Sequence, residues 1–289
     1  MNPKRTEGIL FAILAATLYA FSAPVSKLLL QKVPVTMMAA FLYLGAGAGL
    51  FIIGLFQKKT GRDQKEQPLS GGDLPYVTGM VLLDIAAPIF LMTGLSMTTA
   101  ANAALLNNFE IVATSLIAFF IFRESISKRL GIAIVFVTAA SILLSMNGRS
   151  SFSFSMGSLF VILACICWGF ENNCTRMLSA KNPLHIVVIK GFFSGAGSLG
   201  IALFLGEKFP EAKYLCVALL LGFVAYGLSI LFYIYAQREL GAAKTSTYYA
   251  LAPFIGVAFS LLIFREIPGS LFLLALGIMG VGTYLAATD

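Results

Sequence analysis

Long apolar runs separated by short polar gaps dominate the chain from end to end. A helix needs about 20 apolar residues to cross ~30 Å of hydrocarbon, and ten runs approach that length. Strands of a membrane barrel would instead alternate apolar and polar residues over about ten positions. The pattern therefore predicts an all-α membrane protein with ten transmembrane helices. The predicted spans are residues 8–30, 35–56, 74–96, 101–122, 129–146, 157–178, 184–205, 214–237, 243–264 and 270–287.

Composition removes several other classes of protein. Hydrophobic residues make up 58% of the chain and charged residues 11%, against roughly 25% charged residues in soluble domains. The longest polar gap, residues 57–73, is too short for a catalytic domain. The net charge of +7 does not indicate nucleic-acid binding, because most basic residues lie in the gaps between apolar runs. These features exclude a soluble enzyme, a disordered protein and a nucleic-acid-binding protein.

The basic residues also predict the orientation. Lys and Arg are more numerous in the gaps that face the cytoplasm if the N-terminus is placed there, as the positive-inside rule requires. An even number of spans then returns the C-terminus to the same side. We expect a multi-pass protein of the cytoplasmic membrane with both termini in the cytoplasm.

The chain contains an internal duplication. Residues 17–22 match residues 166–171, an offset of 149, and residues 121–124 match residues 263–266, an offset of 142. One insertion after the second span explains the change of offset. We therefore divide the chain into a first unit, residues 1–148, and a second unit, residues 149–289. Each unit has five spans, an odd number, so the second is predicted to cross the membrane upside down, as in many secondary transporters.

The duplicated unit resembles the EamA family of the drug/metabolite transporter superfamily. The resemblance covers residues 8–146 and 157–287, and both units end in an apolar helix followed by Arg-Glu. The second unit carries a family-like run over residues 248–256, whereas the first has Glu110 and Ile111 where the second has Ala252 and Pro253. The resemblance implies transport of a small metabolite. Relatives carry amino acids, sugars, nucleotide-sugars or quaternary amines.

Ionisable residues inside spans are rare because each costs about 2.5–3.5 kcal/mol on insertion scales. Asp84, Glu110 and Glu171 lie well inside predicted spans, and Lys190 lies a third of the way into the seventh. Lys27 and Arg176 lie near span ends, where long side chains reach the interface, and we expect Lys27 and Arg176 to be structural anchors. The three acids are candidates for binding or coupling.

Polar and aromatic side chains share faces with these acids. Asn107 and Thr114 lie one turn on either side of Glu110, and Asn172 and Trp168 share a face with Glu171. Alignment of the two units pairs Trp168 and Glu171 with Tyr19 and Ser22, and pairs Asp84 and Asn107 with Tyr226 and Tyr249. By pseudo-symmetry we expect these faces to meet at a central cavity. In the alternative interpretation they only hold neighbouring helices together. The candidate site is Glu110, Glu171, Asp84, Asn107, Trp168, Asn172, Tyr19, Ser22, Tyr226 and Tyr249.

This set of side chains favours a secondary active transporter working by alternating access. A carboxyl group in a dry cavity holds a proton readily, and it can exchange that proton for a cationic group, which motivates a hypothesis of proton coupling. Family resemblance favours a small polar metabolite such as an amino acid, with efflux as the direction. The acids and aromatic rings favour an alternative, a carrier of choline-like cationic or quaternary amines. A non-transporting membrane scaffold is the third interpretation.

The sequence shows no motif for catalysis, metal binding or nucleotide binding. The four cysteines fit no zinc motif, and His185 is the single histidine. The sequence contains neither an HExxH pattern nor a Walker motif. We therefore expect no enzymatic activity, no metal and no cofactor. The expected partners are a small-molecule substrate, the lipid bilayer and protons, together with a second copy of the chain bound through spans five and ten, which carry few polar residues.

Overall fold

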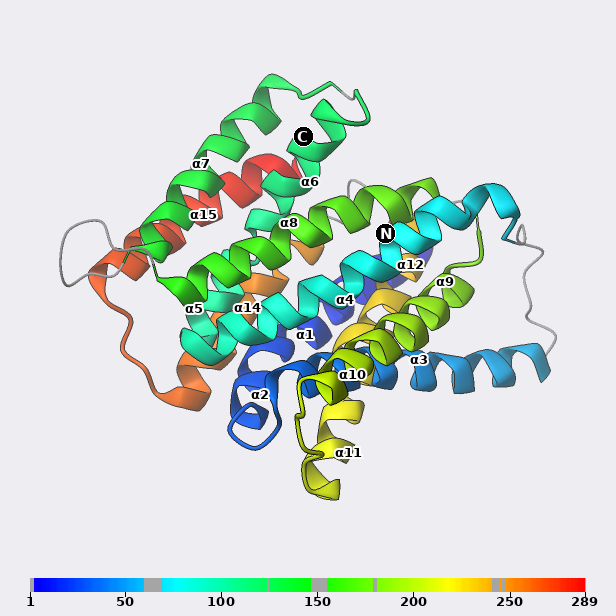
Figure 1. The fold of residues 1–289 in the computed structure, drawn as a ribbon. Helices are drawn as coiled ribbons and strands as arrows, with labels where there is room; N and C mark the ends of the chain where they lie inside the picture. The colour runs from blue at the N-terminus through cyan, green and yellow to red at the C-terminus, as the bar shows by residue number, and fades with distance from the viewer. Residues whose placement is uncertain are drawn as a thin grey trace.

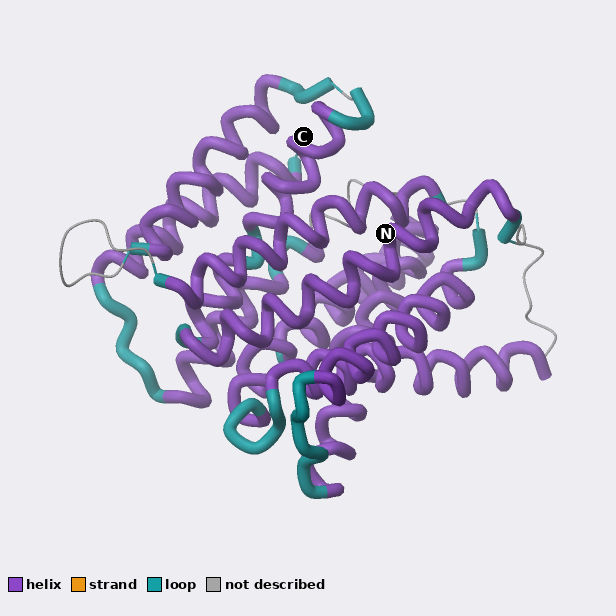
Figure 2. The backbone as a smooth tube through the Cα atoms, in the orientation of Figure 1, coloured by secondary structure: helices purple, strands orange, loops and turns teal. Residues whose placement is uncertain are grey.

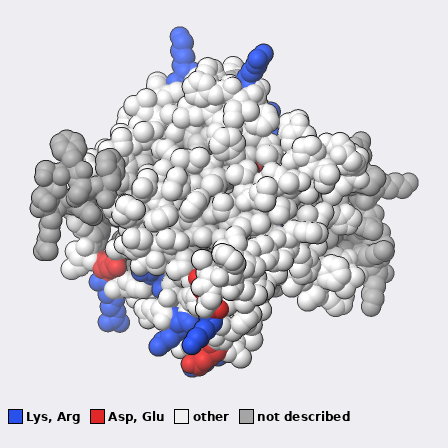
Figure 3. All heavy atoms as spheres, in the orientation of Figure 1, with Lys and Arg blue, Asp and Glu red and all other residues white. Residues whose placement is uncertain are grey.

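The computed structural model describes residues 3–59, 69–123, 125–146, 155–178, 181–240, 245 and 248–288. Within these ranges the chain folds into helices and contains no strand (Figure 2). The helices lie side by side in one bundle (Figure 1). Figure 3 shows that the broad centre of one face is made of uncharged residues, with most Lys, Arg, Asp and Glu toward its edges. The fold is thus all-helical with an apolar surface suited to lipid.

The helices follow the predicted spans closely. In the first half of the chain they are α1 (Pro3–Ala20), α2 (Ser22–Leu29), α3 (Val35–Lys59), the short turn η1 (Gly71–Asp73), α4 (Leu74–Met97), α5 (Ala100–Leu106), α6 (Phe109–Phe120) and α7 (Lys128–Ser145). In the second half they are α8 (Met156–Met177), α9 (Pro183–Ile189), η2 (Lys190–Ser194), α10 (Gly195–Phe204), α11 (Ala212–Leu221), η3 (Gly222–Leu228), α12 (Ser229–Leu240), α14 (Ala252–Phe264) and α15 (Ser270–Ala287).

Nine helical segments of the described chain are long and apolar enough to cross a membrane. This confirms an all-helical, multi-pass architecture. The predicted span 243–264 differs, because its described helix α14 has 13 residues and most of residues 243–247 lie outside the described part. A total of ten spans therefore stays a prediction.

Several spans are interrupted near their middle. Phe21 separates α1 from α2, and Asn107 with Asn108 separates α5 from α6. In the seventh and eighth spans the helix widens into the π-helical segments η2 and η3. Such wide turns are frequent at functional sites, and interrupted helices carry the binding sites of many transporters. The interruptions therefore direct attention to the middle of the bundle.

Helices of the two halves are interleaved. α4 packs along α8, and α12 packs along α1. α6 packs against α8, and α14 packs against α1. When each helix is replaced by its partner in the sequence duplication, these pairs exchange with one another. α7 and α15, the last span of each half, pack together at one end of the bundle (Figure 1).

The two Arg residues of the matching Arg-Glu pairs share an unusual backbone conformation. Arg123 has φ 56° and Arg265 has φ 53°. No other non-glycine residue among those described has a positive φ. Both residues follow the apolar helix that precedes the last span, in the left-handed conformation that commonly terminates helices. The sequence match at these positions thus extends to the local backbone.

Lys27 holds a helix end, as expected of an anchor. Its amino group donates to the carbonyls of Leu95, Ser96 and Thr98, at 2.6, 3.1 and 2.7 Å. The last carbonyls of a helix have no partner within the helix, and a cation there also interacts favourably with the helix dipole. Lys27 therefore stabilises the C-terminal end of α4.

Candidate functional site

Three ionisable side chains from three helices meet inside the bundle. The Lys190 amino group, on the first residue of η2, lies 2.8 Å from Glu171 Oε1 on α8 and 3.1 Å from Asp84 Oδ2 on α4. The Asp84 side chain is fully buried, that of Glu171 is 2% exposed and that of Lys190 is 13% exposed. We call these three residues the ion cluster. One lysine is thus shared by two buried acids.

Neutral donors complete the ion cluster. Tyr43 on α3 donates to Asp84 Oδ1 at 2.8 Å, and the Trp168 indole donates to the Tyr43 hydroxyl at 3.4 Å. Thr175 donates to Glu171 Oε1. Buried charges are tolerated only when they are paired and hydrogen-bonded. The network meets this requirement and joins α3, α4, α8 and η2.

Glu110 has a different environment. It lies in the first turn of α6, directly after the interruption of its span, where the helix dipole favours a negative charge. Asn172 on α8 donates to Glu110 Oε1 at 2.6 Å and to Thr114 Oγ1 at 3.3 Å. Glu110 forms no ion pair within the described ranges, and it is only partly buried. Neutral groups alone bind this acid.

The interruption before Glu110 is held by side-chain contacts. The Cys165 thiol lies 3.7 Å from the carbonyl of Leu106 and 3.8 Å from that of Asn107, within the range of a weak S–H donor. Asn107 Oδ1 is buried and accepts no hydrogen bond from the described residues. The Asn107 carbonyl also accepts a hydrogen bond from the Glu110 backbone N–H at 3.1 Å. Cys165 therefore contacts the two carbonyls at the point where the span is interrupted.

A group of tyrosines lies next to both sets of acids. The ring centroid of Tyr19 lies 5.8 Å from that of Tyr226 and 6.0 Å from that of Tyr249. The ring centroid of Tyr43 lies 5.6 Å from that of Tyr226. Tyr19, Tyr226 and Tyr249 are close enough to Glu110 to interact with its charge. Aromatic faces attract cations within about 6 Å. The tyrosine rings thus lie among the buried acids inside the bundle.

The same region brings together the remaining predicted residues. Ser22 donates to the Tyr226 hydroxyl at 3.1 Å. Glu110 and Glu171 lie close enough to interact electrostatically, and Asn172 follows Glu171 directly on α8. The predicted side chains thus lie in one region. The acids nevertheless fall into two environments, because Asp84 and Glu171 share Lys190 whereas Glu110 does not.

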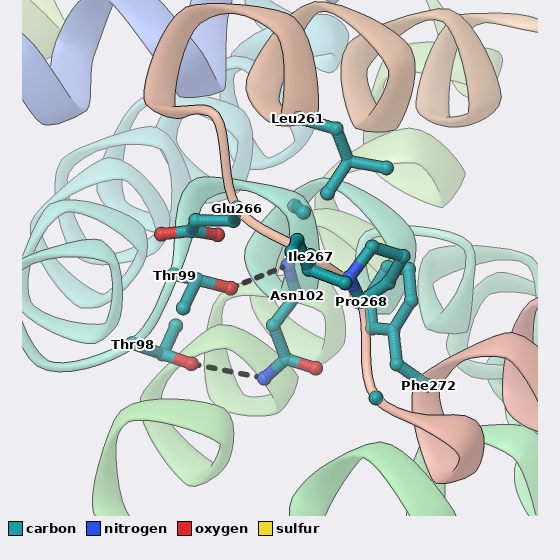
Figure 4. Close-up of a pocket in the computed structure, with 10 residues that line it drawn as sticks. Thr98, Thr99, Asn102, Leu261, Glu266, Ile267, Pro268 and Phe272 are labelled. Carbon is teal, nitrogen blue, oxygen red and sulfur yellow. Dashed lines mark hydrogen bonds between the residues drawn. The ribbon is translucent and has the colours of Figure 1, made fainter.

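A pocket of about 260 Å³ lies where the α4–α5 loop meets the α14–α15 loop (Figure 4). Asn102 in this pocket donates to Thr98 Oγ1 at 2.9 Å, and Glu266 lies across from Thr99 in the view. Asn102 precedes Glu110 by eight residues on the same interrupted span, about 12 Å at helical rise. The pocket therefore lies toward the end of the span that carries Glu110. It is lined by Thr98, Thr99, Ala101, Asn102, Leu261, Glu266, Ile267, Pro268, Gly269 and Phe272.

Comparison with known proteins decides the family. The model of the EamA-like transporter family matches residues 6–146 and again residues 155–288. The chain belongs to the EamA-like transporter family. Its apolar helices and this membership identify a multi-pass membrane protein of a transporter family.

Similar EamA-like proteins bear names that give no substrate. An uncharacterized transporter of Methanothermobacter thermautotrophicus is 27% identical over 280 residues, covering 91% of this chain and 81% of the relative. The uncharacterized transporter YyaM of Bacillus subtilis is 22% identical over 235 residues, covering 77% of this chain and 74% of that protein. One solved structure, described only as a protein, matches with TM-score 0.68 at 16% identity and covers 97% of this chain and 96% of its own. That likeness supports the fold of this EamA-like chain alone.

Sequence reasoning placed Lys190 in the membrane but not in the site. Its position inside an apolar run was the available signal, since an unpaired lysine there is costly. Tyr43 was missed altogether, because a tyrosine in an apolar run has no distinctive pattern. Tyr233, whose ring centroid lies 5.0 Å from that of Tyr249, is likewise not distinguished by any sequence pattern. In this EamA-like chain the cluster emerges only when helices far apart in sequence are brought together.

Proposed function

We propose that the protein is a secondary active transporter that moves a small metabolite with a positively charged amino or quaternary ammonium group by alternating access. The observation that supports this most is Glu110, a partly exposed acid in the middle of its span that accepts a hydrogen bond from the neutral amide of Asn172. The charge of Glu110 is felt by Tyr19, which packs against Tyr226 and Tyr249. A cationic ligand gains both an ionic contact and cation–π contacts there. Family membership supports the transport activity.

The charge balance favours a cation over an anion as ligand. Asp84, Glu171 and Glu110 lie in this region with Lys190 as their cation, and Lys190 already contacts two of the acids. A ligand carboxylate would therefore meet more negative than positive charge, and placing like charges together costs several kcal/mol in an interface. A ligand ammonium group meets the opposite situation.

Glu110 is also the proposed coupling residue. Asp84 and Glu171 contact a fixed cation, so their charge is already compensated in part, whereas Glu110 accepts a hydrogen bond from an amide. An acid in this setting can hold a proton when the ligand is absent and release it when a cation binds. Exchange at one acid would link movement of the amine to movement of a proton in the opposite direction.

Alternating access in our proposal relies on two inverted units, residues 1–148 and 149–289. The exchange of packing pairs between the halves and the shared backbone conformation of Arg123 and Arg265 support the duplication. We further propose ten spans, location in the cytoplasmic membrane, cytoplasmic termini and efflux as the direction. Pairing of two copies through α7 and α15 stays a prediction.

An amino-acid substrate is a second candidate, favoured by Lys190. The Lys190 side chain is 13% exposed, and a shift of its amino group toward a ligand carboxylate would bring both charges of an amino acid into contact with the site. This candidate requires Lys190 to leave at least one of its two acids during binding. The cationic amine requires no such rearrangement.

The test is transport in proteoliposomes with choline and leucine as probes, with internal pH recorded. We expect choline to move and to drive proton flux, and Glu110→Gln to reduce this coupled flux at least about tenfold, as loss of a charged partner predicts. Glu211→Gln is the matched control, because Glu211 is 68% exposed and pairs with Lys213 away from the site. Leucine flux without choline flux would favour the second candidate. No flux of either probe, with folded protein, would contradict the proposal and favour a scaffold.

A further inference from the structure

The ion cluster has an unusual balance of charge. Two carboxylates from α4 and α8 face one ammonium group from η2. The other donors to the cluster, Tyr43 and Thr175, are neutral. Asp84 Oδ2 accepts no hydrogen bond of normal geometry, so the Lys190 charge is its compensation. Without Lys190, two buried carboxylates would face each other with only hydroxyl groups as partners.

The position of the lysine amino group is therefore a cation position. Two carboxylate oxygens within 3.1 Å of one nitrogen form the surroundings that an alkylammonium ion would seek. Glu110 is a second acid position, occupied by no cation of the described chain. A ligand with two ammonium groups could pair with acids at both positions, but the Lys190 amino group already occupies the one at Asp84 and Glu171.

The backbone places this amino group by a local device. Lys190 begins the π-helical segment η2, whereas the corresponding residues 41–45 in the first half belong to the regular helix α3 and carry Phe41 at the matching position. The wide turn and the charge thus occur together in one half. Packing alone does not require a charged side chain here, because its counterpart position carries a phenylalanine.

We propose that Lys190 is a tethered cation that fills the second cation position of the site and so restricts the transporter to ligands with a single ammonium group. The proposal rests on the proposed function for the nature of the ligand. The role of Lys190 itself does not depend on the ligand. Its ammonium group occupies the position at Asp84 and Glu171 that a free cation or a proton would otherwise occupy. Removal of the lysine must then recruit one, either a proton or the second ammonium group of a dication.

The experiment uses the full chain in lipid nanodiscs and compares wild type, Lys190→Met, Lys190→Arg and the neutral variant Asp84→Asn/Glu171→Gln/Lys190→Met. The first measurement is the infrared band of protonated carboxyl groups, without ligand. We expect Lys190→Met to gain one protonated carboxyl group relative to wild type. Lys190→Arg and the neutral variant should gain none.

The second measurement is binding of alkylamines and of α,ω-diamines of matched chain length, followed by thermal shift. We expect Lys190→Met to shift the ratio of diamine to monoamine affinity by at least about tenfold toward the diamine, the effect of a hydrogen bond to a charged group. Bound diamine should also reduce the new carboxyl band. The neutral variant should show no such shift of the ratio.

The two measurements together support or overturn the role of Lys190 as a tethered cation. An unchanged carboxyl band together with an unchanged affinity ratio in folded Lys190→Met would overturn the proposal. A gained band in a protein that binds no amine would support the tethered cation while contradicting the proposed substrate class. Should Lys190→Met fail to fold, recovery in the neutral variant supports a charge role, and failure of both variants indicates a packing role and overturns it.

Discussion

Two pairs of residues that correspond in the sequence duplication differ in charge. In one, Asp84 on α4 and Glu171 on α8 are joined through Lys190. In the other, the sequence partners of these acids, Tyr226 and Ser22, bond directly to each other at 3.1 Å. The duplication thus preserves which positions meet, while one pair is charged and the other is neutral. Each pair joins one residue of the first half to one residue of the second.

The backbone differs at the same places. η2 and η3 are π-helical and lie in the seventh and eighth spans, whereas their counterparts in the first half belong to the regular helices α3 and α4. Away from the site the halves agree, as the shared conformation of Arg123 and Arg265 shows. Divergence is therefore concentrated in the spans that carry the candidate site.

Breaking the charged pair should cost more than breaking the neutral one. Lys190→Met leaves two buried carboxylates without their cation, and we expect a loss of about 3–5 kcal/mol of unfolding free energy. Tyr226→Phe removes one hydrogen bond between neutral groups and should cost about 1 kcal/mol. Chemical unfolding of the purified protein measures both. Equal losses would show that the charge of the cluster carries no special weight.

The next largest loss of stability is expected where the π-helical segment η3 packs closely against the backbone of α3. A Cβ at Gly222, in η3, would collide with the backbone carbonyl of Leu42 on α3. Backbone cannot yield as a flexible side chain can, so Gly222→Ala should cost about 1–3 kcal/mol by overpacking. Gly277 on α15 has nothing within 4 Å of its added Cβ. Gly277→Ala is the matched control and should gain up to about 1 kcal/mol from helix propensity. A Gly222→Ala variant as stable as this control would refute the contact.

The smallest expected change in stability concerns the backbone conformation that the two halves share at Arg123 and Arg265. Arg123 and Arg265 adopt a left-handed conformation that costs a non-glycine residue about 1 kcal/mol or more. Glycine relieves this strain but also increases the conformational entropy of the unfolded chain, which offsets part of the gain. Arg123→Gly and Arg265→Gly should therefore each stabilise the protein by less than about 1 kcal/mol, and by similar amounts. Thermal unfolding of the two variants side by side measures the gains. A gain in one and a loss in the other would show that the two helix ends are not equivalent.

Sequence alone predicted the helical class and most span boundaries, because long apolar runs are strong signals. It also placed Asp84, Glu110 and Glu171 inside spans, while their role in binding or coupling stays a prediction. The ion cluster could not be predicted, since pairing Lys190 with Asp84 requires knowing how η2 faces α4. Periodicity also predicted unbroken helices where η2 and η3 widen. Both widened segments lie close to α3, with Gly191 against Gly47 and Gly222 against Leu42, and no local sequence pattern reveals these contacts.

In the proposed mechanism, Glu110 exchanges a proton for the ligand while Asp84 and Glu171 remain paired with Lys190. Proton release on adding choline to purified protein in weakly buffered solution tests this directly. We expect about one proton to be released per choline bound in wild type and none in Glu110→Gln. Choline binding without proton release, or the same release from Glu110→Gln, would contradict it.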